Sequence, residues 1–259
     1  MIRPTGRSIP LLVALLMGST AQAASNREVY DDFEGSTLSK VWDTERFAPG
    51  SVELQSIVTR VGRGAAKVTV HQGDKYEGID PLQSKETERA ELMERKDLVA
   101  REEDGFAYAF SLFLPKDFQV VPTRLVLAQW KQYDVKRTAL VDNPVVALRY
   151  VGGELSVTLQ TSRKQQTLFR TNEEIRGRWL DFVFHLKYVR SDGGLVRVWL
   201  NGKQVCDFHG TTAYTEEFGY PKNGWFYFKM GLYRDRMAEP MNAFFDEYRK
   251  RPLTEEESK

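Results

Sequence analysis

The chain is predicted to be an all-β protein, a β-jelly-roll sandwich of two antiparallel sheets with a concave groove. From residue 51 onward, apolar and polar residues alternate with the period of a β-strand. Glycine-rich turns separate these alternating segments, and helical patterns are few and short. The segments show no repeat and no linker, which is typical of a single two-sheet sandwich.

The alternating segments give about a dozen candidate strands. They cover residues 52–58, 65–70, 90–94, 107–114, 124–130, 145–150, 154–160, 179–189, 195–200, 203–208, 225–233 and 242–249. Asn201-Gly202 predicts a tight hairpin between two of them. Residues 36–41 are expected to form one helical turn, residues 254–258 a frayed tail, and residues 131–143 a loop over one edge of the sandwich.

The first residues have the features of an export signal. Arg3 and Arg7 precede an apolar run at residues 9–17, and Ala21-Gln-Ala23 is a small-x-small cleavage site. We therefore expect residues 1–23 to be a signal peptide and residues 24–259 to form one secreted or periplasmic domain. Because no stretch approaches the roughly 20 apolar residues of a membrane helix, no membrane partner is expected.

Composition restricts the partners of the chain. The 37 basic and 36 acidic residues give a net charge of +1, so no general attraction to nucleic acid is expected. Recognition of an anion must then come from a local cluster of basic groups. The single cysteine, Cys206, excludes an internal disulfide and is expected to be a small buried hydrophobe in a monomer.

The segment 225–234 carries the most unusual pattern. Read as a strand, it has one apolar face that consists of Phe226, Phe228, Met230 and Leu232. The opposite face carries aromatic rings, an ammonium group, a gap and a phenol, supplied by Trp225, Tyr227, Lys229, Gly231 and Tyr233. Such a face suits a flat, hydroxylated and negatively charged ligand.

Two further segments offer matching polar groups. Arg89 and Glu91 share one face of a strand, with Glu91 able to orient Arg89, and Gln129 and Lys131 share a face of another. With Tyr233, this set suits β-elimination on a uronic acid. Charges and hydrogen bonds on the uronate carboxylate stabilise the enolate-like state, a base takes the C5 proton, and an acid protonates the departing oxygen.

These segments resemble the signature strands of jelly-roll polysaccharide lyases, over roughly residues 28–250. The motifs are Arg89-Ala-Glu-Leu92, Gln129-Trp-Lys131 and Tyr227-Phe-Lys-Met-Gly-Leu-Tyr-Arg234. Ala128-Gln-Trp-Lys-Gln132, followed by Asn143-Pro-Val-Val-Ala-Leu-Arg149, is most similar to the group containing heparin lyase I and glucuronan lyase. Alginate lyases have the looser pattern Arg-x-Glu-Leu, Gln-x-His and Tyr-Phe-Lys-x-Gly-x-Tyr.

The resemblance implies that Tyr233 is the catalytic acid and that Gln129, with Arg89, meets the substrate carboxylate. It implies that the groove is lined by Glu91, Lys229, Tyr227, Trp225 and Arg234. The alginate-type pattern has a histidine where this chain has Lys131, so the base stays open. Tyr233 itself, Lys131 with a lowered pKa, and His71 are the candidates, whereas His185 and His209 are expected to be ordinary sheet and surface histidines.

Acidic residues near both ends of the domain suggest a structural metal. Asp31-Asp-Phe-Glu-Gly35 and Phe244-Phe-Asp-Glu247 resemble paired terminal strands that often hold Ca²⁺ in jelly-roll carbohydrate enzymes. Carboxylates and backbone carbonyls suit this hard cation. Glu34 and Asp246 are the expected ligands.

The sequence therefore predicts an exported polysaccharide lyase acting on an acidic polysaccharide that is glucuronan-, heparin- or alginate-like. A long basic thumb like that of heparin lyase I is not evident, which favours a glucuronan-like substrate. One alternative is a glycoside hydrolase of the laminarinase type, which needs two carboxylates flanking the scissile bond. Glu91 and Glu94 are three residues apart and would face opposite ways on a strand. The other alternative is a non-catalytic carbohydrate-binding protein.

Overall fold

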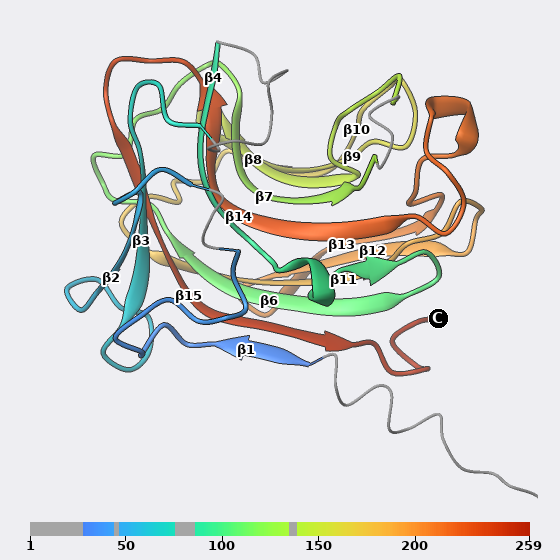
Figure 1. Ribbon diagram of the computed structural model, residues 1–259, viewed down its shortest axis with the longest axis horizontal. Helices are drawn as coiled ribbons and strands as arrows, with labels where there is room; N and C mark the ends of the chain where they lie inside the picture. Colours follow the sequence, from blue (N-terminus) through green and yellow to red (C-terminus); the bar gives the residue numbers. More distant parts are fainter. Residues whose placement is uncertain (1–27, 44–46, 76–85, 135–138) are drawn as a thin grey trace, which may run out of the picture.

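The computed structural model describes residues 28–43, 47–75, 86–134 and 139–259, so the expected signal peptide, residues 1–23, lies outside the described part. Within it, the chain forms two antiparallel sheets packed face to face (Figure 1). Only short 3-10 helices accompany them among these residues, η1 (Lys96–Leu98) and η2 (Glu216–Phe218). The all-β jelly-roll prediction is confirmed.

One sheet has eight strands in the order β13-β12-β11-β6-β15-β3-β2, with β1 also paired to β15. Its strands are β1 (Val29–Asp31), β2 (Val52–Gln55), β3 (Ala65–Val70), β6 (Gly105–Phe113), β11 (Trp179–Lys187), β12 (Gly194–Leu200), β13 (Lys203–Gly210) and β15 (Met241–Pro252). In Figure 1 this sheet is the lower layer.

The other sheet has seven strands in the order β10-β9-β8-β7-β14-β4, with β5 also paired to β14. Its strands are β4 (Thr87–Met93), β5 (Ala100–Arg101), β7 (Leu125–Gln132), β8 (Val146–Val151), β9 (Glu154–Leu159), β10 (Gln166–Thr171) and β14 (Trp225–Asp235). In Figure 1 it is the upper layer, and the ends of β7, β8 and β14 curve upward so that its outer face is concave.

Every predicted strand segment coincides with an observed strand, but three strands were not predicted. β1 and β5 are very short, and β10 has no buried residue and little apolar alternation. Residues 36–41 form bends and a turn rather than a helix, while residues 254–258 form one turn closed by a bond from the Ser258 N–H to the Thr254 carbonyl (3.1 Å). The Asn201-Gly202 hairpin is present, with positive φ at both residues as a tight turn requires.

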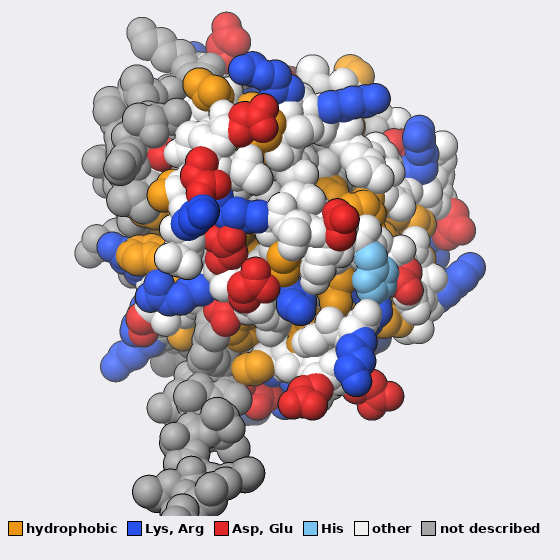
Figure 2. Space-filling model, turned by 90° about the vertical axis from the view of Figure 1, so that its right-hand side faces the viewer, with side chains coloured by type: hydrophobic (Ala, Val, Ile, Leu, Met, Phe, Trp, Pro, Cys, Tyr) orange, Lys and Arg blue, Asp and Glu red, His pale blue; other side chains and the backbone are white. Residues whose placement is uncertain are grey.

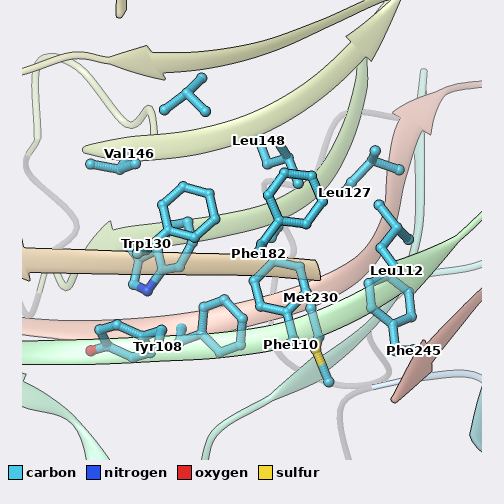
Figure 3. Close-up of a cluster of buried hydrophobic side chains, with 14 of the residues drawn as sticks. Tyr108, Phe110, Leu112, Leu127, Trp130, Val146, Leu148, Phe182, Met230 and Phe245 are labelled. Atoms are coloured by element: carbon cyan, nitrogen blue, oxygen red, sulfur yellow. The ribbon is translucent and has the colours of Figure 1, made fainter. Parts of the chain in front are cut away.

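The core lies between the two sheets (Figure 3). Aromatic and aliphatic side chains meet there from both layers, among them Tyr108 and Phe110 of β6 and Trp130 of β7. The predicted apolar face of β14 is part of this core, because Phe226, Phe228, Met230 and Leu232 are all fully buried. Each such side chain stabilises the fold by about 1.5–3 kcal/mol, so burial of this face holds the other face of β14 outward.

A bulge fixes which residues of β7 face outward. Met230 pairs with Ala128, but Tyr233 pairs with Val126, so the register shifts between them. As a result Leu127 and Ala128 both belong to the core. The shift leaves Gln129 and Lys131 in phase with each other on the outer face, as predicted, because strict alternation resumes after Ala128.

The surface mixes charges of both signs. On the side shown in Figure 2, Lys and Arg side chains alternate with Asp and Glu side chains, in keeping with the net charge of +1. The described residues include no helix with the length and apolar character needed to cross a bilayer. Cys206 is buried and unpaired, as expected.

Candidate active site

The outer face of the seven-stranded sheet gathers most of the predicted site residues in adjacent cross-strand rows. One row across β9, β8, β7, β14 and β4 consists of Ser156, Arg149, Val126, Tyr233 and Arg89. The next row consists of Thr158, Ala147, Gln129 and Lys229, and Gly231 lies opposite Glu91. Since neighbouring strands are about 4.8 Å apart, the phenol, amide and basic groups lie close together on the outer face, with Gln129 and Lys229 buried among them.

Tyr233 lies between two guanidinium groups. Arg124 donates from Nη1 to the phenol oxygen at 3.0 Å, and the guanidinium carbon of Arg89 lies 4.1 Å from the centre of the Tyr233 ring. The ring is only half-buried. Negative charge that develops at or beside this oxygen would therefore be stabilised by cations already in place.

Glu91 connects the polar groups of this face. Its side chain is only 1% exposed and accepts a hydrogen bond from the Gln129 amide. The Arg89 guanidinium lies 3.8 Å and the Lys229 ammonium 3.7 Å from its carboxylate. Because a buried carboxylate must be compensated by cations and hydrogen-bond donors, Glu91 fixes the positions of three predicted site residues at once.

The two lysines of this face differ in their electrostatic setting. Burial lowers the pKa of Lys229 to about 7, although Glu91 opposes the shift. Burial also acts to lower the pKa of Lys131, but Tyr227 and Asp142 outweigh it and the net shift is upward. The Lys131 ammonium lies 2.7 Å from Asp142. The surroundings of Lys131 therefore do not favour it as the candidate base with a lowered pKa, and Lys229 is the lysine whose pKa is lowered.

His71 directly follows β3 of the eight-stranded sheet, in a turn that contacts β4 of the sheet that carries the site. Its exposed ring has Nδ1 3.3 Å from Asp74, and the Arg89 N–H donates to the Asp74 carbonyl at 3.0 Å, which holds this turn against β4. His185 and His209 lie within β11 and β13 of the eight-stranded sheet, away from that turn. Of the three histidines, His71 is thus the one that borders the candidate site.

An aromatic surface continues the face beyond Lys131. Tyr133 stacks on Trp225 with ring centres 6.1 Å apart and an angle of 10°, and meets Tyr227 edge-on at the same distance. The Arg101 guanidinium lies 5.3 Å from the Trp225 ring. Trp225 and Tyr227 therefore lie on the predicted face, where both are half-buried and Tyr133 is exposed. Aromatic rings at such a surface can stack against sugars.

Arg234 does not lie with these residues. Its phase is that of the core, it is fully buried, and its guanidinium pairs with the equally buried Glu88 at 3.0 Å. It also donates to the Glu239 carbonyl at 2.7 Å. This placement corrects the assignment of Arg234 as a substrate contact, because the sheet separates its side chain from the outer face.

The expected metal ligands, Glu34 and Asp246, bind one backbone loop instead. Glu34 accepts from the Arg63 and Gly64 N–H groups, which lowers its pKa. Asp246 accepts from the Arg60 N–H at 2.8 Å, and burial raises its pKa. No cluster of three or more His, Cys, Asp or Glu side chains suited to a metal occurs in the described ranges. These contacts do not test the expected calcium site, and calcium binding at Glu34 and Asp246 stays a prediction.

Three residues that the sequence reasoning did not single out belong to the face. Arg124 touches the Tyr233 phenol, Tyr133 stacks on Trp225, and Arg149 donates from Nε to the Thr158 hydroxyl at 3.1 Å. An arginine in the middle of a predicted buried strand was a usable signal for Arg149. Arg124 and Tyr133 carry no such signal, since their contacts depend on how strands pair across the sheet.

The two carboxylates that a hydrolase would need are not brought together. Glu91 lies on the outer face, whereas Glu94 is fully buried on the inner side, where it accepts from the Tyr248 hydroxyl and pairs with Lys250 at 2.9 Å. The predicted opposite orientation of Glu91 and Glu94 is confirmed.

Comparison with known proteins gives one family match and several structures of similar fold. Residues 33–249 match the polysaccharide lyase family, and no curated protein matches the chain. The endo-beta-1,4-glucuronan lyase of the fungus Trichoderma reesei superimposes with a TM-score of 0.63 at 16% identity, over 82% of this chain and 91% of that one. An alginate lyase of Polysaccharide Lyase family 7 gives 0.52 at 14% identity, over 80% and 84%. The cellulose induced protein Cip1 gives 0.52 at 14% identity, over 86% and 96%. These likenesses are likenesses of fold.

Proposed function

The chain belongs to the polysaccharide lyase family, and on this premise we propose that it cleaves a uronic-acid-containing polysaccharide by β-elimination. Its place in the family makes it a lyase that acts on polysaccharides. The polymer, the bond chemistry and the residue roles are the proposal. The observation that carries them is the meeting of a phenol, an amide and several cations on one concave face.

The proposed β-elimination needs two proton transfers and the stabilisation of one negative charge. A base removes the C5 proton of the uronate, the bond from C4 to the glycosidic oxygen breaks, and a C4–C5 double bond forms while an acid protonates the departing oxygen. Tyr233 is the acid in this scheme. Gln129 and Arg89 meet the carboxylate, whose negative charge grows in the enolate-like state.

The base is proposed to be Tyr233 or His71. Lys131 is a poor proton acceptor, because Tyr227 and Asp142 raise its pKa and hold it cationic. His71 borders the face and pairs with Asp74, an arrangement that orients an imidazole. Tyr233 would act in both steps if the C5 proton and the departing oxygen lie on the same side of the sugar ring.

A glucuronan-like polymer is proposed as the substrate, ahead of heparin- and alginate-like chains. The glucuronan lyase superimposes more closely than the alginate lyase, at 0.63 against 0.52. The described basic groups also form a small cluster rather than an extended thumb. Export by the segment at residues 1–23, to the periplasm or the medium, fits a polymeric substrate and forms part of the same proposal.

The test is a panel of polyuronates read by ultraviolet absorbance. Glucuronan, heparin and alginate are incubated with the folded protein, and the unsaturated product of β-elimination is expected to raise absorbance on at least one of them. Tyr233→Phe is expected to abolish the signal with little change in melting temperature. Tyr30→Phe is the matched control, because Tyr30 lies on the other sheet and donates to Glu247.

Each alternative predicts a different result. Silence of the folded wild-type protein across the panel would overturn the proposal. Reducing ends without ultraviolet absorbance would indicate a hydrolase, and binding of a polyuronate without cleavage would indicate a carbohydrate-binding protein. Full activity of Tyr233→Phe would remove Tyr233 from the acid role.

A further inference from the structure

Arg149 is the unusual cation of the outer face. It is half-buried, and the interactions described for it are a hydrogen bond to the Thr158 hydroxyl and electrostatic contact with Arg124 and Tyr233. Within the described ranges it takes part in no ion pair, whereas Arg89, Arg124 and Arg234 each have a carboxylate within 4.0 Å. Among the described residues, Arg149 thus has a like charge beside it and no paired anion.

This arrangement is electrostatically unfavourable when no anion is bound. Burial lowers the pKa of the Arg149 guanidinium, and the neighbouring Arg124 lowers it further. A partly desolvated cation beside another cation lowers the free energy of unfolding, whereas an apolar residue at the same place would not. An anion that binds between Arg149 and Arg124 would recover that free energy, and two guanidinium groups suit a carboxylate in particular.

The location connects this cation pair to the reacting group. Arg149 pairs with Val126, and Val126 pairs with Tyr233, so Arg149 lies two strands from β14, or about 10 Å. The positions between and beside them carry small or short side chains, Val126, Ala147 and Ser156. Val126, Ala147 and Ser156 are themselves buried, and Arg149 lies close to both Arg124 and Tyr233. A ligand bound at Arg149 would therefore lie next to one bound at Tyr233.

We propose that Arg149 and Arg124 form an anion subsite that binds the carboxylate of the uronate next to the one that reacts. The inference rests on the proposed function and specifies its substrate class, a polymer in which uronates follow one another directly. In a polymer where uronates alternate with neutral sugars, this subsite would face an uncharged neighbour, so such chains are poor substrates.

Steady-state kinetics of Arg149→Gln test the subsite. With glucuronan, the variant is expected to raise KM about 10- to 100-fold, the value of one charge-assisted hydrogen bond, with kcat changed much less. Arg149→Lys keeps the charge but not the planar fork and is expected to recover part of the loss. Arg178→Gln, a loop arginine 3.6 Å from Glu173, is the control that leaves KM unchanged.

A binding measurement keeps the test independent of turnover. In the Tyr233→Phe background, calorimetry with a glucuronate tetramer is expected to give a Kd about 10- to 100-fold weaker when Arg149→Gln is added. The wild-type protein is also expected to cleave glucuronan far better than a glucuronate polymer that alternates with N-acetylglucosamine.

The outcomes separate the two proposals. If the wild-type protein cleaves glucuronan while Arg149→Gln leaves KM and the tetramer Kd unchanged, the subsite is overturned and the proposed function stands. If the wild-type protein neither binds nor cleaves any polyuronate, the proposed function fails first. If Arg149 had a purely structural role, Arg149→Gln would lower the melting temperature. Because the variant removes the repulsion between Arg149 and Arg124, the melting temperature is expected to stay unchanged or to rise.

Discussion

Lys229 is the residue whose charge is most sensitive to pH on the outer face. Burial lowers its pKa to about 7, so the free protein loses this charge as pH rises through neutrality. If Lys229 binds substrate as a cation, kcat/KM, which reports the free enzyme, is expected to fall above about pH 7. Lys229→Arg keeps the charge at all these pH values and is expected to remove the fall.

Lys131→Arg is the control for this profile, because the pKa of Lys131 is already raised and the residue stays cationic. Its kcat/KM profile should keep the wild-type shape. A kcat/KM that instead rises through pH 7 and is lost in Lys229→Arg would assign Lys229 to proton abstraction rather than to anion binding.

Arg234 is expected to affect stability and not substrate affinity. Arg234→Met leaves the fully buried Glu88 carboxylate without its guanidinium, which costs about 3–5 kcal/mol in denaturant unfolding. The double variant Glu88→Gln/Arg234→Met should recover much of that loss. A stable Arg234→Met protein with a raised KM would contradict this assignment and return Arg234 to the substrate.

The face of the sheet on which a single residue lies could be predicted from sequence where the alternation of apolar and polar residues is clear. Tyr233 and Lys229 were placed on the outer face because Leu232 and Met230 had to be buried. Arg234 follows the same alternation, and its period alone would have put it inside. It was assigned to substrate from the resemblance instead. Arg124 could not be found, because its contact with Tyr233 joins residues 109 positions apart.

At the scale of strands, alternation identified the long segments and failed where a strand is short or irregular. β1 and β5 have two or three residues and offer too little pattern to read. The register shift between β7 and β14 could not be predicted, since nothing in Leu127-Ala128 shows that both side chains are buried. A bulge depends on how a strand pairs with its neighbour, and the sequence of the strand itself does not show this pairing.

Gly231 makes the close pairing of β14 with β4 possible. Its φ is +145°, and a Cβ there would lie 2.3 Å from the Ala90 carbonyl oxygen and 2.7 Å from the Glu91 Cα. Gly231→Ala is therefore expected to destabilise the protein by about 2–4 kcal/mol in thermal or denaturant unfolding. Because the displaced backbone carries Glu91, kcat is expected to fall as well.

Gly152→Ala is the matched control for Gly231→Ala. Gly152 also has a positive φ, +62°, but a Cβ there would meet no described atom within 4 Å. Its cost should be about 1 kcal/mol, from backbone strain alone, with unchanged kcat. Equal losses for the two variants would show that the contact with β4 is not what Gly231 provides.

For the whole molecule, the residues that stabilise the fold and the residues of the candidate site lie on opposite faces of the sheets. The inner faces of both sheets form the core, while the polar rows lie on the outer face of the seven-stranded sheet. The net charge of +1 supplies no long-range attraction for an acidic polymer. If the substrate is such a polymer, as proposed, its affinity is expected to come from the local cations of that face, chiefly Arg89, Arg124, Arg149 and Lys229.

Salt provides the test of this local origin. The Debye screening length falls from about 10 Å at 0.1 M to about 3 Å at 1 M ionic strength. The exposed cations of the cluster are therefore expected to attract a polyuronate less strongly at high salt. The KM for glucuronan is expected to rise roughly tenfold between 0.05 and 0.5 M NaCl, with a smaller change in kcat. The dependence should weaken in Arg149→Gln and persist in Arg178→Gln, which lies outside the face. A KM that does not respond to salt would mean that stacking on Trp225 and Tyr133, rather than charge, holds the polymer.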